Sequence, residues 1–376
     1  MQPKAARNIS IEAPRLVAVA GIAVFHTFQW TFQAFCVGAV EYAPFAMFPY
    51  SGVLGFINLL GCWANEVFFM ISGYFLIASA ARAWDGGATW KPQMQRTAQR
   101  LGKVILPTTF YCLVALAWST VVSPIPDVTL NTHYWYTLGL EFIWVYAATV
   151  FMAPRFGLAK SRLPQKTYTT TVIAVGILAF VVNGYLAAMS ATSAGEFSWL
   201  QKLMSAVTYA IAFLIGGLLR DVTDAMDSNR AGALGTRSLA AVLVLATILE
   251  GALSYTGNLT AMAVLSYKST SLISFALAAA SLLFAATRRS APGNPRTAGV
   301  IVTLSTATLG FYVMQSLTSS LWRPVFNTLL ANILVSQNSP VAIYIVTGTV
   351  ISIVFALTLL TIDAARSLIA RKLKRQ

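Results

Sequence analysis

The sequence predicts an all-α integral membrane protein, a bundle of about ten transmembrane helices with both termini in the cytoplasm. Hydrophobic residues make up 57% of the 376 residues and charged residues only 10%, whereas soluble domains carry about 25% charged residues. Apolar windows of roughly 20 residues, long enough to span the hydrocarbon core as a helix, recur along the whole chain. Composition and periodic apolar runs therefore place the chain in a membrane.

The apolar windows divide the chain into ten expected spans. The first is too long and lacks the small-residue cleavage pattern of a removable signal peptide, and the segments between spans are too short for a soluble domain. We therefore expect residues 1–376 to form one membrane domain. In chain order, the expected spans are 14–36, 54–80, 104–123, 134–153, 170–189, 203–219, 238–256, 269–287, 300–322 and 340–362.

Lysine and arginine follow the even-numbered spans and precede the first. In this arrangement 23 of the 26 basic residues lie on one side of the membrane, and Lys202, Lys268 and Arg323 lie on the other. The positive-inside rule then places the termini in the cytoplasm and the chain in the cell's cytoplasmic membrane, as a multi-pass protein in contact with membrane lipids. The same distribution argues against nucleic acid as the partner of the net charge of +14.

The basic segment 84–103 has two interpretations, and the three cysteines have only a structural one. The basic segment 84–103 leads into the third span, and it either lies on anionic headgroups or binds a phosphate. Cys36, Cys62 and Cys112 show no CxxC pairing, so we expect packing residues, with no disulfide framework and no metal site.

Four ionisable residues inside the expected spans are functional candidates, because charge within a membrane is costly. They are His26, Glu66, Glu141 and Glu250. Counted from the cytoplasmic end of each span, all four lie roughly 18 to 21 Å deep. The sequence therefore predicts that they share one layer. His133, by contrast, is expected at the outer edge of the fourth span.

The spacing of Arg15 and His26 places both on one face of a helix, about 16 Å apart, because eleven steps of 100° make three turns plus about 20°. They can line one channel from the cytoplasm. Alternatively, Arg15 reaches for the headgroups and His26 makes an interhelical hydrogen bond. A neutral imidazole beside a carboxylate is suited to act as a general base. Glu66 is the preferred carboxylate partner.

Several segments resemble the acyltransferase 3 family of integral-membrane acyltransferases. Arg15-x10-His26, preceded by Glu12 where an aspartate is usual, is similar to the family's first-helix signature. "FFMISGYF" (68–75), "RLGKVILP" (100–107), "HYWYTLGLEFIWVYAATVFMAP" (133–154) and "LGFYVMQSL" (309–317) resemble later segments in matching order. The chain looks most like the short type that O-acetylates enterobacterial common antigen, which lacks an extra extracytoplasmic domain.

The resemblance implies transfer of an acyl group, usually acetyl, from cytoplasmic acetyl-CoA to a hydroxyl of an envelope saccharide or a lipid-linked acceptor. It implies no bound cofactor, since acetyl-CoA is a co-substrate. It gives His26 the catalytic role, as general base or acyl carrier, and gives donor binding to Arg15 and Arg100, with Lys103 in place of a second arginine. The catalytic part of Glu66 is our inference from the residues alone.

Further polar and aromatic residues of these segments are candidates for substrate contact or for lining a pore. They are Ser72, Trp135, Glu141 and Gln315, the last standing where many family members carry a histidine. Two rival functions remain at this point. One is a transporter or flippase of a lipid-linked saccharide that uses the mid-membrane charges as a proton relay, and the other is a membrane structural or immunity protein without turnover.

Overall fold

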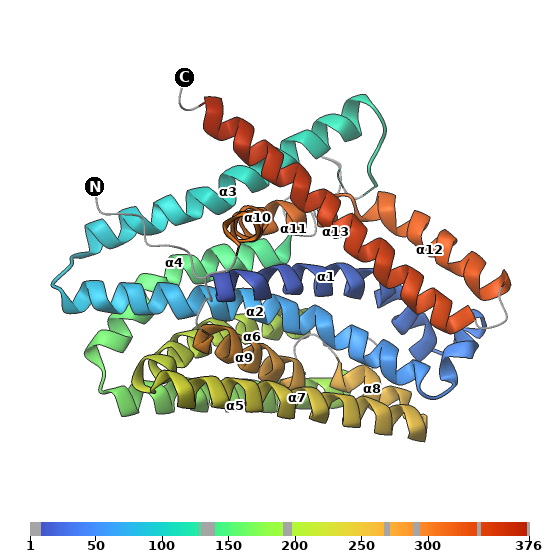
Figure 1. The fold of residues 1–376 in the computed structure, drawn as a ribbon, viewed down its shortest axis with the longest axis horizontal. Coiled ribbons are helices and arrows are strands. Elements are labelled where there is room, and N and C mark those ends of the chain that lie inside the picture. Colours follow the sequence, from blue (N-terminus) through green and yellow to red (C-terminus); the bar gives the residue numbers. More distant parts are fainter. Residues whose placement is uncertain are drawn as a thin grey trace.

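The computed structural model describes residues 9–126, 128, 140–190, 198–266, 271–288, 294–336 and 340–373. Within these ranges the chain is helical and contains no β-strand, which confirms the predicted fold class (Figure 1). The elements are α1 (Ile9–Cys36), η1 (Val40–Ala46), α2 (Tyr50–Asp85), α3 (Trp90–Val121), α4 (Glu141–Arg162), α5 (Gln165–Ser190), α6 (Ser198–Ala225), α7 (Ser228–Thr256), α8 (Leu259–Leu265), α9 (Leu272–Thr287), α10 (Pro295–Thr306), α11 (Thr308–Leu317), α12 (Ser319–Ser336) and α13 (Pro340–Leu373).

Each of the ten expected spans overlaps a helix of the structure. In the described part of the chain, eight helices are long and apolar enough to cross a membrane, and the bent pair α10–α11 makes a ninth. The eighth expected span corresponds to α9, an apolar helix of only 16 residues. The multi-pass architecture is therefore confirmed, while the count of ten stays a prediction.

The segment expected as one straight span over 300–322 is instead divided among three helices. The axis bends by 43° between α10 and α11, and a second interruption separates α11 from α12 at Thr318. A serine or threonine hydroxyl lies at each interruption and donates to a backbone carbonyl of the preceding turn. Ser305 Oγ donates to the carbonyl of Val302 at 3.0 Å, and Thr318 Oγ1 donates to that of Met314 at 2.7 Å.

The helix α2 passes through the middle of the bundle, where α1, α4 and α6 pack around it (Figure 1). Glycines allow the close approach, as is usual between membrane helices. A Cβ atom at Gly73 would overlap the carbonyl of Phe213 on α6, and one at Gly216 would overlap that of Met70 on α2. The buried core consequently follows α2 along its length.

The two ends of the bundle differ in charge. Basic residues occupy the last turns of α2, α4 and α13, namely Arg82, Lys160, Arg162, Arg371 and Lys372. Figure 1 shows that α1 begins, and α2, α4 and α13 end, toward this same side of the molecule. We call it the basic end, and the sequence predicts that it faces the cytoplasm.

Reporter fusions test this orientation. Fusions after Lys160 and Arg230 should report a cytoplasmic location, and fusions after Val122 and Ser336 an external one, because the basic end holds most lysines and arginines. The measurement is a paired phosphatase and fluorescent-protein assay at each position. A fusion at Lys160 that reads as external would contradict the predicted orientation.

Candidate active site

His26 lies in α1, and its ring contacts an arginine from the far end of the sequence. Nη2 of Arg323, in the first turns of α12, lies 3.3 Å from Nδ1 of His26. The amide of Gln29, one turn further along α1, lies 3.2 Å from the same nitrogen. The ring of Phe25 covers the imidazole, with 5.0 Å between ring centroids. The histidine therefore faces a cation, not the carboxylate that the sequence predicted.

The pairing of His26 with Arg323 requires one particular tautomer. A guanidinium group only donates hydrogen bonds, so Nδ1 accepts from Arg323 when the neutral ring carries its hydrogen on Nε2. In the other tautomer Nδ1 donates to Gln29, whose Oε1 is the atom that lies 3.2 Å away. The first tautomer is the one that can act as a base here, because it places the lone pair of the imidazole on Nδ1, beside the guanidinium.

Both helices that carry the pair are held by further contacts. Trp322, next to Arg323, donates from Nε1 to the carbonyl of Gln315 at 3.0 Å, which joins α12 to α11. On α1, the hydroxyl of Thr27 accepts a hydrogen bond from Ser352 Oγ of α13 at 2.8 Å. The Arg323–His26 contact is thus built on elements whose positions are fixed on either side.

Glu66, the expected partner of His26, lies at a different level of the bundle. Gly21 of α1 packs against Trp63 of α2, and Gly61 of α2 packs against Phe25 of α1. In this antiparallel register Glu66 is opposite a residue about seven positions before His26, which corresponds to about 10 Å along the axis. The Glu66 side chain is buried, and its Oε2 has no hydrogen-bond partner among the described residues. The structure therefore does not form the predicted pair.

The predicted layer of four ionisable groups is also wrong. The carboxylate of Glu250 packs against Gly55, eleven residues before Glu66 on α2 and so about 16 Å further from the basic end. Glu141 is exposed in the first turn of α4, whose register with α2 brings it close to the level of Glu66. The depths predicted for these four residues were counted from the span boundaries, and they were wrong because the helices begin at different levels of the bundle.

A small cavity lies between α2, α3, α4 and α11, nearer the basic end than His26. Its volume is about 130 Å³, and Phe68, Tyr146 and Tyr312 are among its lining residues. The hydroxyls of Ser72 and Tyr146 are hydrogen-bonded at 2.9 Å. Arg100, half-buried one turn before the lining residue Val104 on α3, lies within electrostatic range of Tyr146. We call this space the donor cavity.

The remaining expected residues fall in three groups. Arg15 forms an ion pair of 2.9 Å with Glu12 and is only partly exposed, and Lys103 points away from the donor cavity into solvent or headgroups. Gln315 is buried in α11, and its Nε2 has no hydrogen-bond partner among the described residues. Trp135 and His133 lie outside the described residues.

Sequence reasoning missed two charged groups that the structure places inside the bundle. Arg323 follows directly after an expected span and was assigned to the outer surface. Asp363 also falls one residue beyond its window; it accepts a hydrogen bond from Tyr111 at 2.7 Å and pairs with Arg366 at 2.6 Å. In both cases the signal was a charged residue at the edge of an apolar window, where boundaries are uncertain by a few residues.

None of the described residues form a cluster of three or more histidine, cysteine, aspartate or glutamate side chains that could hold a metal ion. The three cysteines are free thiols.

Comparisons with known proteins agree with the sequence motifs. A family described as an acyltransferase domain matches residues 8–360, nearly the whole chain. No match was found among curated proteins or among solved structures. The matched region contains both His26 and Arg323, the donor cavity and every helix described above except the last 13 residues of α13. The chain belongs to the acyltransferase 3 family of integral-membrane acyltransferases.

Proposed function

We propose that this protein transfers an acyl group, acetyl in the first instance, from acyl-CoA at the basic end to a hydroxyl of an envelope saccharide or lipid-linked acceptor. The observation that carries the proposal is the contact of Arg323 with His26. An imidazole with an accessible lone pair can take the proton of a hydroxyl. A guanidinium beside it can stabilise the negative charge that develops on the carbonyl oxygen during acyl transfer.

The donor approaches from the basic end in this proposal. The phosphates of CoA are attracted by the basic residues there, including the half-buried Arg100. The uncharged arm of CoA then enters the donor cavity, whose aromatic walls and single pair of hydroxyls suit a mostly apolar chain. Helix α11 lines this cavity with Tyr312 and reaches Gln315, whose carbonyl anchors Trp322 beside Arg323. In this proposal the donor thioester reaches the catalytic pair along α11.

The transfer itself begins when substrate displaces the guanidinium of Arg323 from Nδ1 of His26. The acceptor hydroxyl then gives its proton to Nδ1 while its oxygen attacks the thioester carbon. The displaced guanidinium donates to the carbonyl oxygen, which becomes negative. As the C–S bond breaks, the sulfur of CoA leaves and takes the proton from the imidazole. In the second route Nδ1 attacks the thioester carbon, the C–S bond breaks, and the sulfur of CoA leaves with the proton of Nε2. The hydroxyl oxygen then takes the acyl group from Nδ1 while Nε2 takes the hydroxyl proton, which regenerates the neutral imidazole.

Glu66 belongs to the donor side in this scheme. Its level matches that of the donor cavity, about 10 Å from His26 along the axis. We therefore propose a role for Glu66 in the donor passage and assign the partner of His26 to Arg323.

Transport of a lipid-linked saccharide is the rival function. The 43° bend between α10 and α11 favours it, because transporters often have interrupted helices near their substrates. A transporter would move the saccharide without breaking the thioester of acyl-CoA. Release of CoA by the purified protein, with label from acetyl-CoA appearing in envelope material, supports the acyltransferase; movement of saccharide without CoA release supports transport.

His26→Gln tests the catalytic role directly. Glutamine keeps hydrogen bonding but does not accept the proton of a hydroxyl, so acyl transfer should fall by about 10² to 10⁴-fold. The measurement is the rate of CoA release from acetyl-CoA with envelope acceptor present. Thermal unfolding and expression should match the wild type, and near-normal transfer by well-folded His26→Gln would reduce His26 to a structural residue.

Arg323→Gln tests the stabilisation of the oxyanion. Loss of a donor aimed at a developing negative charge lowers kcat by about 10² to 10³-fold, with a smaller change in KM. Arg323→Lys should recover part of the rate because it restores the charge without the planar geometry. Lys202→Gln, an exposed basic residue of α6, is the matched control and should keep full kcat. Equal rates for Arg323→Gln and the control would remove Arg323 from the chemistry.

Arg100→Ala tests the donor path. A hydrogen bond to a charged group contributes about 1.5 to 3 kcal/mol, so the KM for acyl-CoA should rise about tenfold or more. Use of the acceptor should change less, and Lys103→Ala should have a weaker effect because Lys103 is exposed. An unchanged donor KM in Arg100→Ala would leave this segment with a role at the lipid headgroups only.

A further inference from the structure

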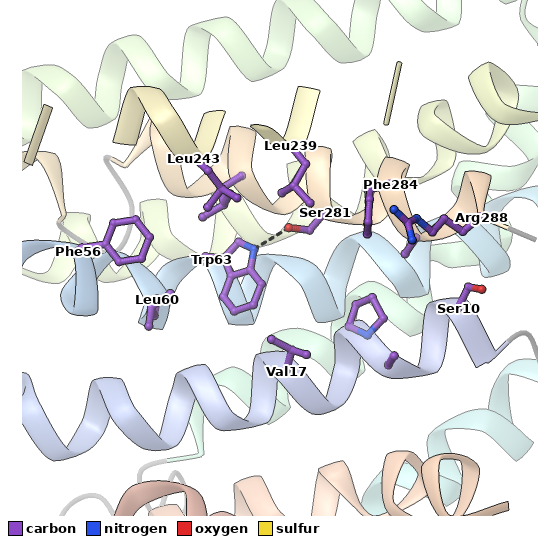
Figure 2. Close-up of a pocket in the computed structure, with 14 residues that line it drawn as sticks. Ser10, Val17, Phe56, Leu60, Trp63, Leu239, Leu243, Ser281, Phe284 and Arg288 are labelled. Carbon is purple, nitrogen blue, oxygen red and sulfur yellow. Dashed lines mark hydrogen bonds between the residues drawn. The ribbon is translucent and has the colours of Figure 1, made fainter. Parts of the chain in front are cut away.

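A second and larger cavity opens on the opposite face of α1. It has a volume of about 510 Å³ and lies between α1, α2, α7 and α9 (Figure 2). We call it the lateral groove. Exposed Val17 and Leu243 on its rim open it toward the surrounding lipid. Its occupant is therefore a molecule that is available from within the membrane.

The interior of the lateral groove is apolar. At its floor, Trp63 donates from Nε1 to Ser281 Oγ at 3.1 Å, so these two polar groups satisfy each other. The other polar side chains of the lining, Ser10 and Arg288, lie together at one end, while Phe56 lies at the other (Figure 2). A ligand that fits has one long apolar part and one polar end.

The dimensions agree with one chain of a lipid in the leaflet at the basic end. From Leu277 to Arg288 the wall formed by α9 advances by eleven residues, or about 16 Å. Half of a hydrocarbon core of about 30 Å is about 15 Å. The groove therefore extends from the membrane surface to about the middle of the bilayer.

The positive charge of Arg288, at the polar end of the lateral groove, favours a lipid with an anionic headgroup. Arg288 is exposed, and its guanidinium stacks on the ring of Phe284, 4.2 Å from the ring centroid. It forms no ion pair with any carboxylate of the described residues. A positive charge at this height attracts a lipid phosphate, and the planar guanidinium can bind two of its oxygens.

The groove is separate from the proposed chemistry. His26 follows Val17 by nine residues, and nine steps of 100° place the two on opposite faces of α1. We infer that the lateral groove is a binding site for an anionic glycerophospholipid, with one acyl chain along Trp63 and the phosphate against Arg288. This site neither holds the acyl donor nor depends on the identity of the acceptor.

Lipid retention tests the inference on the full-length protein. The protein is equilibrated in detergent with equal amounts of phosphatidylglycerol and phosphatidylcholine carrying the same chains, and bound lipid is counted by native mass spectrometry. The wild type should retain one lipid per chain and prefer phosphatidylglycerol. Arg288→Gln should lower the preference for phosphatidylglycerol over phosphatidylcholine about fivefold, because one basic residue near the surface attracts an anionic lipid by about 1 kcal/mol. Arg162→Gln, an exposed arginine outside the groove, should keep it.

Filling the groove provides the second arm. Ala13→Phe places a ring in the space for the acyl chain and should lower retention of both lipids equally. Should Ala13→Phe fail to give monodisperse protein, Leu243→Trp on the exposed face of α7 fills the same space. The inference is overturned if the filled variant retains lipid like the wild type, or if Arg288→Gln and Arg162→Gln have the same effect on headgroup preference.

Discussion

The contact between Arg323 and His26 is the constraint on which the candidate site depends. A guanidinium is costly inside a membrane protein unless its donors are used, and here one of them reaches the imidazole of His26. The contact is held in place because α12 begins where α11 ends and Trp322 anchors that junction to Gln315. The interrupted course of α10, α11 and α12 is thus what brings a positive charge to the histidine.

Arg366, a partly exposed arginine, shows what a structural ion pair looks like in the same bundle. Arg366 pairs with Asp363, which also accepts from Tyr111, and a Cβ atom at Gly310 would overlap the Asp363 side chain. This cluster joins α3, α11 and α13 with each charge matched by its opposite. The Arg323–His26 contact instead joins a cation to a proton acceptor. Such a pair suits a reaction that generates negative charge.

The sequence predicted the fold class because apolar length and basic alternation are properties of single segments. It singles out His26 as a candidate for the same reason, since one histidine within an apolar run is conspicuous. It could not predict which groups meet. The levels of Glu66 and Glu250 depend on helix register, which here is set by glycine contacts such as Gly61 against Phe25 and Gly55 against Glu250. The sequence places Arg323 on the outer surface because hydropathy does not distinguish an interrupted helix from a straight one.

Helix α1 satisfies two unrelated requirements with two different spacings. Ala13, Val17 and Gly21 recur every four residues and give one face the small side chains that accommodate the lateral groove and the ring of Trp63. Arg15 and His26, eleven residues apart, share another face, where His26 contacts Arg323 of α12 and Arg15 pairs with Glu12. Because both spacings fit the α-helical repeat, a single apolar helix can serve as the wall between a lipid site and a reaction site. Changes on the small-residue face should therefore alter lipid contact without moving the imidazole.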